Sequence, residues 1–561
     1  MNKINTIIIV VFMIIVSCST NQKVNELSSK NDYKDLLEVF IELRKLQDPV
    51  LNNGVPDYTP KAMASQKKSL VLLLNNMQMI DTTGWNIHDR VDFHLVLAEM
   101  KALEFHHRIY RPWARDPGFY SFRSGDAGAS MNVESFIRPL FDSEASLTND
   151  QKNKTIKFLK IVPEIFQQAR VNLIDGCSDF ADLAIRNGEG EARMFENFAG
   201  KFNNIHPDLA SDLKLVASEI RLFGKWLYEN KHTMTSPAGV GKENYSWWMK
   251  NVQLSPWGWE ESSEIIQREY DRIITFLKLE EHRNRDLPAL KVSMTRKEYE
   301  KSIHNALHHV VDFLDDGKLM TIDDWVNPAD YTGFENVSEL EEHFSNSKNS
   351  NEEFSPENTS IDTKVRQREI VPGESHEYIG HMLDYQRQER LNLSPIRKAE
   401  RRFNMGSMRL EGWAVALEEL LMQVGVLDDR PRKGREMEYL MNASHMSLAI
   451  PDMKLHANEI NLAESRKLCA EIMPRGWSRE DEDMVWFEMQ SNIRNPGGFH
   501  SNVVTGKAYF MKLFRERAVQ LGDDFVIKDF IDEFLSFGII PMPLIRWEMT
   551  GNDDEIKMLI K

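Results

Sequence analysis

PGESHEYIGHMLD (residues 372–384) and RLEGWAVALEE (residues 409–419) are the two segments around which the chain is organised. The first contains four candidate ligands within eight residues: Glu374, His376, Glu377 and His381. The second places Glu411 and Glu418 seven residues apart, hence on one face of a helix. Two imidazoles and a downstream carboxylate are a common zinc-enzyme ligand set, in which a further glutamate serves as general base. The two segments therefore indicate a metal site built on helices.

The spacing of the two histidines does not fit the usual zinc signature. In His-Glu-x-x-His the histidines are four residues apart and share one side of a helix. His376 and His381 are five apart, which is roughly 140° around a regular α-helix. Gly380 and the pair Pro372-Gly373 favour a local distortion of the helix, which would change this angle.

Two ligand sets follow from the sequence. In the first, His376, His381 and Glu411 bind zinc, and Glu377 takes a proton from the bound water. In the second, Glu374 or Glu377 joins His381 and Glu411 in a carboxylate-rich site. That second set suits manganese, iron or calcium better than zinc. The identity of the divalent metal therefore depends on which set binds it.

The composition predicts a large, soluble, helical fold. The 561 residues are 42% hydrophobic, enough for an extensive core. Apolar residues recur at helical spacing along most of the chain, as at Leu36, Phe40 and Leu43, and predict an all-α fold. We expect two helical lobes around a deep cleft. A net charge of −17 without a basic stripe argues against a nucleic-acid partner.

The N-terminus has the pattern of a bacterial lipoprotein signal. An apolar run at residues 6–16 is too short to span a bilayer and ends at Ile15-Val16-Ser17-Cys18, which resembles a lipobox. We predict a signal peptide over residues 1–18, lipidation of Cys18 and a tether over residues 19–30. One large helical domain follows over residues 31–556, with a polar loop or insertion near residues 331–361. These features predict a cell-envelope protein, held by its lipid at the outer membrane on its periplasmic side or at the cell surface.

A second histidine pair lies on a predicted helix over residues 295–313. His304 and His308 are four residues apart and share one face, which suits a metal. No glutamate follows His304, so this pair is only a secondary metal candidate.

The second segment also carries a family resemblance. Glu411-Gly412-Trp413-Ala414 with Glu418 resembles a motif of the bacterial domain-of-unknown-function 885 family, helical proteins similar to gluzincin-type metallopeptidases. Further resemblance lies at Leu393 to Arg397, at Trp113 to Pro117, at Asp452 with His456, and at Arg494 to Pro496 with Gly506-Lys507. The resemblance implies a gluzincin- or carboxypeptidase-like helical fold over most of residues 30–550.

This sequence differs from the family at the residues expected to bind the metal. The family shows His-Glu-x-x-Pro-Gly-His-His, and no alignment of residues 368–381 preserves all of it. A family tyrosine near the C-terminal glycine also lacks a clear counterpart, for which His500 or Tyr509 are the candidates. The resemblance therefore supports the fold more directly than the activity.

Three functions remain open at this point. The first is a lipid-anchored, zinc-dependent hydrolase acting on a peptide or small-molecule substrate. The second is an inactive paralogue that binds a peptide or glycan at the surface. The third is a carboxylate-rich metal enzyme of different chemistry. Residues expected to support the ligands or contact substrate are Glu374, Glu418, Asp452, His456 and Arg494.

Overall fold

The computed structural model describes residues 32–122, 131, 134–142, 147–293, 296–331 and 359–559. The predicted signal peptide, Cys18, the tether and residues 332–358 of the polar segment lie outside this range. The described chain is mostly helical with almost no strands, which confirms the all-α prediction. Its strands are the short hairpin β1 (Leu51–Asn52) and β2 (Val55–Pro56). No described helix is long and apolar enough to cross a membrane.

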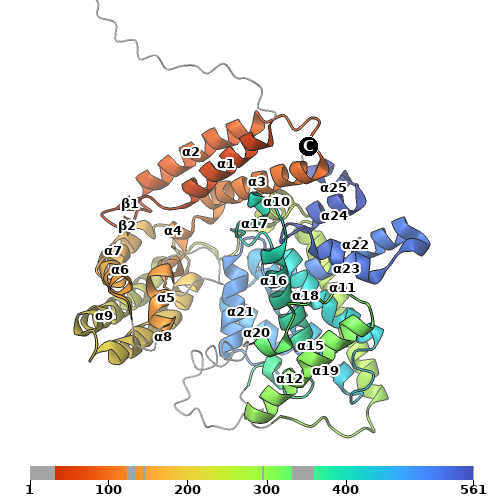
Figure 1. Cartoon of the computed structure of the whole chain (residues 1–561). Helices are drawn as coiled ribbons and strands as arrows, with labels where there is room; N and C mark the ends of the chain where they lie inside the picture. Colours follow the sequence, from red (N-terminus) through yellow and green to blue (C-terminus); the bar gives the residue numbers. More distant parts are fainter. Residues whose placement is uncertain are drawn as a thin grey trace, which may run out of the picture.

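Three helices form a layer at the N-terminal end of the molecule (Figure 1). They are α1 (Tyr33–Gln47), α2 (Pro60–Gln78) and α3 (Ile87–Phe105). Each begins at a polar cap whose side chain accepts a backbone N–H: Asp32, Thr59 and Asn86 respectively. Pro60 at the first helical position suits this start, since its ring presets φ.

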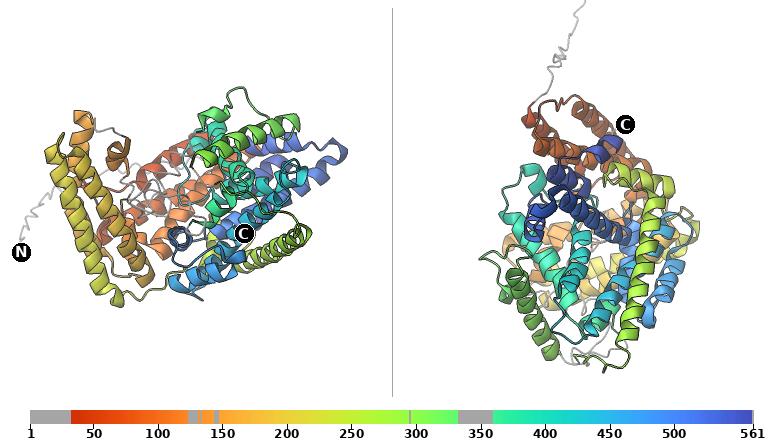
Figure 2. Two further views of the ribbon diagram at one scale, coloured as in Figure 1. Left: turned by 90° about the horizontal axis from the view of Figure 1, so that it is seen from below. Right: turned by 90° about the vertical axis from the view of Figure 1, so that its right-hand side faces the viewer.

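The buried apolar side chains form two clusters. The smaller cluster draws chiefly on the helices between residues 112 and 230, including the long antiparallel pair α8 (Ser178–Phe202) and α9 (Pro207–Asn230). These helices stand to one side of the others in Figure 2. The other helices of this part are α4 (Pro112–Arg115), α5 (Glu134–Asp142), α6 (Asn149–Leu159) and α7 (Val162–Asn172). The two lobes, the deep cleft between them and the gluzincin-like fold stay predictions.

The larger cluster draws on α1, α2, α3, the first turns of α8 and the helices that follow residue 240. In chain order the later helices are α10 (Lys242–Asn251), α11 (Trp259–Arg283), α12 (Arg296–Asp316), α14 (Ile361–Arg366), α15 (Val371–Glu374), η5 (Ser375–Leu383), α16 (Asp384–Arg390), α17 (Pro395–Lys398), α18 (Ser407–Val424), α19 (Gly434–His456), α20 (Leu462–Ile472), α21 (Asp483–Arg494), α22 (His500–Leu521), α23 (Ile527–Leu535), α24 (Met542–Thr550) and α25 (Asp554–Leu559).

Helix α18 is the centre of this part because two glycines let neighbouring backbones touch it. A Cβ atom on Gly412 would lie 2.4 Å from the carbonyl carbon of Gly506 in α22. A Cβ on Gly380 of η5 would lie 2.7 Å from the Cβ of Ala414 in α18. Trp413 between these contacts is fully buried against Phe510 and Phe534. The Glu-Gly-Trp-Ala segment is therefore a packing motif as well as a source of ligands.

Buried ion pairs fix the relative positions of these helices. Arg409, at the start of α18, is bound to Asp384, directly after η5, and both side chains are fully buried. This pair joins the two elements that carry the candidate ligands. In the same way, buried Arg397 of α17 binds Asp92 of α3 at 2.6 Å and Glu548 of α24 at 3.0 Å. It ties the N-terminal layer to the C-terminal helices.

Candidate metal centre

The first ligand segment is a π-helix, and this solves the spacing problem. Residues Ser375–Leu383 form η5, in which each N–H bonds to the carbonyl five residues earlier. Residues five apart therefore lie above one another, whereas on an α-helix they would diverge. The Nε2 atoms of His376 and His381 are 2.9 Å apart, and the ring centroids are 4.6 Å apart. The distortion expected around Gly380 is present and brings both histidines to one side.

Glu411 completes a three-ligand cluster from α18. Its Oε2 atom lies 3.6 Å from His376 Nε2 and 3.4 Å from His381 Nε2. The three ligand atoms all lie within 4.8 Å of one another. Two ligands at about 2.05 Å from a tetrahedral zinc ion are about 3.3 Å apart, so the observed triangle matches one face of such a site. The donor set of two imidazoles and one carboxylate also fits zinc.

Glu418 orients His376 from behind the cluster. Its Oε1 atom lies 2.6 Å from His376 Nδ1, and its side chain is inaccessible to solvent. Two helical turns separate it from Glu411, so one face of α18 supplies both carboxylates. With the proton on Nδ1 directed at Glu418, the Nε2 lone pair of His376 faces His381 and Glu411. Carboxylates that hold ligand histidines in this way are typical of metal sites.

The electrostatics of the cluster favour a cation. Burial alone would lower the pKa of His376, but the carboxylates of Glu411 and Glu418 raise it well above its ordinary value. Burial would raise the pKa of Glu411, yet His381 and His376 hold it well below its usual range. Glu418 itself has a raised pKa because burial outweighs the opposing effect of His376. The carboxylate of Glu411 thus lies against both Nε2 atoms, and its negative charge favours a cation at that point.

Glu374 and Glu377 lie beside this cluster, bound to Arg366 of α14. Arg366 donates to Glu374 at 2.9 Å and to Glu377 at 3.3 Å. Burial raises the pKa of Glu374 to about 7, against the opposing charge of Arg366. Glu377 is 46% exposed, and its pKa is lowered because His376 and Arg366 outweigh the effect of partial burial. Among the described residues neither carboxylate belongs to a ligand cluster, so the geometry favours the histidine-containing set.

Three further ionisable side chains surround the cluster. His445 of α19 stacks on His376 with ring centroids 5.9 Å apart, and its ligand atom groups with those of His376 and Glu418. Glu488 of α21 lies 3.4 Å from His500 of α22. Burial raises the pKa of Glu488 to about 8, helped by the charges of Glu411 and Asp362.

Sequence patterns point only weakly to His445, Glu488 and His500. Neither His445 nor Glu488 has another histidine, aspartate or glutamate three or four residues away, so nothing in their spacing marks them as ligands. Only the family resemblance points to His500, as a counterpart of the family tyrosine. The other candidate for that place, Tyr509, is buried and bonded to Glu555 of α25.

Asp452, His456 and Arg494 lie outside the ligand cluster and are all buried. Asp452 Oδ2 accepts the backbone N–H groups of Phe499 and Ser501 at 3.0 and 2.9 Å. It thereby holds the start of α22, where His500 sits.

The other two residues also make structural contacts. His456 Nε2 lies 2.9 Å from the carbonyl oxygen of Asn492. Arg494 binds Asp116 through two N–H groups, at 2.7 and 3.2 Å, and so joins α21 to the segment that follows α4. Their predicted contact with substrate stays a prediction.

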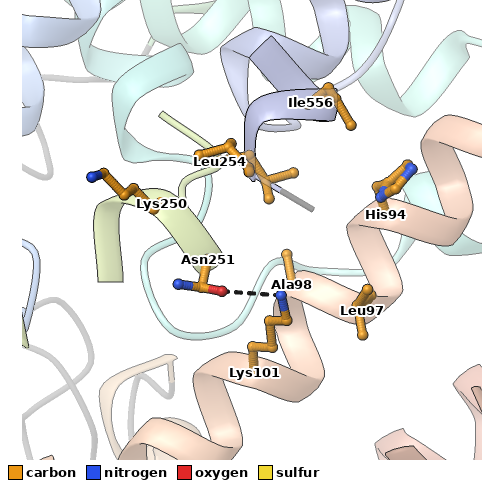
Figure 3. Close-up of a pocket in the computed structure, with 9 residues that line it drawn as sticks. His94, Leu97, Ala98, Lys101, Lys250, Asn251, Leu254 and Ile556 are labelled. Carbon is orange, nitrogen blue, oxygen red and sulfur yellow. Dashed lines mark hydrogen bonds between the residues drawn. The ribbon is translucent and has the colours of Figure 1, made fainter. Parts of the chain in front are cut away.

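A second histidine pair and a small cavity lie elsewhere in the described chain. His304 and His308 are exposed on α12 with ring centroids 4.6 Å apart, and no described third ligand joins them. A cavity of about 20 Å³ lies between α3, α10 and α25, where Lys101 donates to Asn251 at 3.0 Å. Figure 3 shows the residues that line it. That volume holds about one water molecule and excludes a substrate.

Comparison with known proteins confirms the family resemblance. Residues 369–549, which carry every proposed ligand, match the sequence model of DUF885, described as a bacterial protein of unknown function. No curated protein sequence matches this chain.

Two solved structures share the fold along nearly the whole chain. The structure of a "putative lipoprotein of unknown function" from Shewanella oneidensis has a TM-score of 0.67 at 14% identity, covering 92% of this chain and 98% of that chain. The "putative lipoprotein" from Colwellia psychrerythraea has a TM-score of 0.66 at 13% identity, covering 93% and 99% respectively. At these identities the likeness establishes the fold alone.

Proposed function

We propose that this chain is an exported, lipid-anchored, metal-dependent hydrolase that acts on peptides. The observation that carries the proposal is the convergence of His376, His381 and Glu411, with Glu418 fixing the tautomer of His376. Zinc is the ion that the donor set and its spacing suit best. The lipobox-like sequence ending at Cys18 and the lipoprotein descriptions of the two similar structures support the anchor.

The residues around the cluster have distinct roles in this proposal. A metal ion held there would polarise a scissile carbonyl and acidify a water molecule. Glu377, whose pKa is lowered and whose carboxylate is exposed, accepts the proton of the attacking water. Glu488, whose pKa is raised to about 8, carries a proton at neutral pH and suits donation to the leaving amine. Arg366 holds Glu377 in place.

The test is reconstitution of activity with metal. The chain from Ser19 onward retains every described helix and would be stripped with a chelator, then reloaded with zinc, manganese or calcium. Cleavage of a complex peptide mixture would be followed by mass spectrometry. We expect zinc to restore cleavage and Glu377→Gln to reduce its rate by about 10²–10⁴-fold.

Glu389→Gln is the matched control. Glu389 is an exposed glutamate on α16, and among the described residues it has no ion-pair partner. Its substitution should leave the rate unchanged. A chain that binds zinc but cleaves no peptide would overturn the hydrolase proposal and favour a binding protein.

A further inference from the structure

Helix α2 presents a stripe of basic and apolar side chains to solvent. Lys61, Lys68 and Leu72 of α2 and Met79, its C-terminal cap, fall within about 40° of one another around the helix, because they are separated by whole numbers of turns. The opposite side carries the buried residues Met63, Leu70, Leu73 and Met77. Leu72 is 58% exposed, Met79 43%, and the flanking Val71 49%. The outer side of α2 is thus neither a packed face nor an ordinary polar one.

The charge of α2 is opposite to that of the chain. The helix contains Lys61, Lys67 and Lys68 and no aspartate or glutamate, whereas the whole chain has a net charge of −17. All three lysines are exposed, and within the described part of the chain none of them forms an ion pair. Three free cations beside exposed aliphatic side chains are the composition of a helix that lies on an anionic lipid surface.

The position of α2 matches the position of the N-terminus. Helix α2 lies at the outer edge of the N-terminal layer, packed along α1 (Figures 1 and 2). The described chain begins at Asp32, the cap of α1, and residues 19–31 separate it from Cys18. Thirteen residues span at most about 45 Å when extended. A lipid on Cys18 would therefore keep this layer within reach of the membrane.

We propose that the outer face of α2 docks on a bilayer that contains anionic lipid headgroups. The ammonium groups of Lys61 and Lys68 on this face, and that of Lys67 at its flank, contact the headgroup phosphates. Val71, Leu72 and Met79 insert between the outer acyl carbons. Lysine stems can lie along the apolar surface while their charges stay in water. The acidic remainder of the chain is repelled by the same surface, so the contact fixes one orientation. This docking does not depend on hydrolase activity.

The test is binding of the unlipidated chain to vesicles. The chain from Ser19 onward would be cosedimented with vesicles of phosphatidylcholine containing about one-third phosphatidylglycerol, and with pure phosphatidylcholine. We expect binding to the anionic vesicles that is lost in high salt. Replacing all three lysines by glutamine should weaken it about a hundredfold, since each lysine near such a surface contributes about fivefold. Leu72→Ser should weaken binding with the net charge unchanged.

The matched control changes the same charge elsewhere. Lys157, Lys201 and Lys214 lie exposed on α6, α8 and α9, and their joint replacement by glutamine should leave binding within about twofold. The proposal is overturned if the unaltered chain does not bind anionic vesicles. Equal loss of binding in the two triple variants would overturn it as well, because net charge rather than α2 would then govern the contact.

Discussion

Removing one partner of the buried Asp384–Arg409 pair should destabilise the fold strongly, and Asp384→Asn tests this. Both side chains are fully buried, and two N–H groups of Arg409 face the carboxylate. The asparagine variant leaves the Arg409 charge in the core with its counter-charge removed. Breaking one partner of such a pair costs about 3–5 kcal/mol of unfolding free energy.

This cost translates into a measurable change in melting temperature. Unfolding entropy is about 2.1 cal/mol/K per residue, hence about 1 kcal/mol/K for a unit of roughly 500 residues. Asp384→Asn should therefore lower the Tm by about 3–5 °C in scanning calorimetry. The double variant Asp384→Leu with Arg409→Met removes both charges and should recover much of that loss.

An exposed ion pair supplies the control. Glu42 and Lys45 on α1 are 2.8 Å apart but mostly solvent-exposed, so Glu42→Gln should shift the Tm by less than about 1 °C. If Asp384→Asn lowers the Tm no more than Glu42→Gln does, the pair does not hold η5 against α18 and the reasoning fails.

Three further changes have defined outcomes. Glu418→Gln should weaken zinc binding by about 10–100-fold in a chelator competition, since it removes the charge that orients His376. Gly412→Ala should lower the Tm by about 1–3 °C, because the added Cβ would lie 2.4 Å from the carbonyl carbon of Gly506. Gly224→Ala should raise the Tm, because its Cβ would meet no atom within 4 Å and alanine favours the helix. Burial raises the pKa of Glu488 from 4.5 to about 8, so the folded state keeps its full stability below pH 4.5 and loses stability as the pH rises through about 8. Glutamine cannot ionise, so the Tm of Glu488→Gln should rise by about 2–4 °C relative to the unaltered chain between pH 5 and 9.

Helical periodicity sufficed to predict the all-α fold, because buried stripes such as Leu36, Phe40 and Leu43 recur every three to four residues. The same rule predicted that Glu411 and Glu418 share a face, as they do. Both properties depend on regular α-helix geometry alone, so local sequence is enough to predict them.

The histidine pair could not be placed by that rule. Regular geometry sets His376 and His381 apart, and their approach depends on a π-helix whose hydrogen bonds shift by one residue. Gly380 lies within this π-helix, and it lets the helix pack closely against Ala414 of α18. Ala414 is distant in sequence, so local sequence alone does not reveal the contact. His445 reaches the cluster only through the packing of α19, which sequence spacing does not encode.

Metal content is the most direct test of the central claim. The chain from Ser19 onward would be purified without chelator, and its metal content measured by inductively coupled plasma mass spectrometry. His381→Ala and the control His304→Ala on α12 would be measured in the same way. We predict about one zinc ion per chain, lost in His381→Ala and retained in His304→Ala. Absence of stoichiometric metal, or metal that persists in His381→Ala, would contradict the assignment of His376, His381 and Glu411 as its ligands.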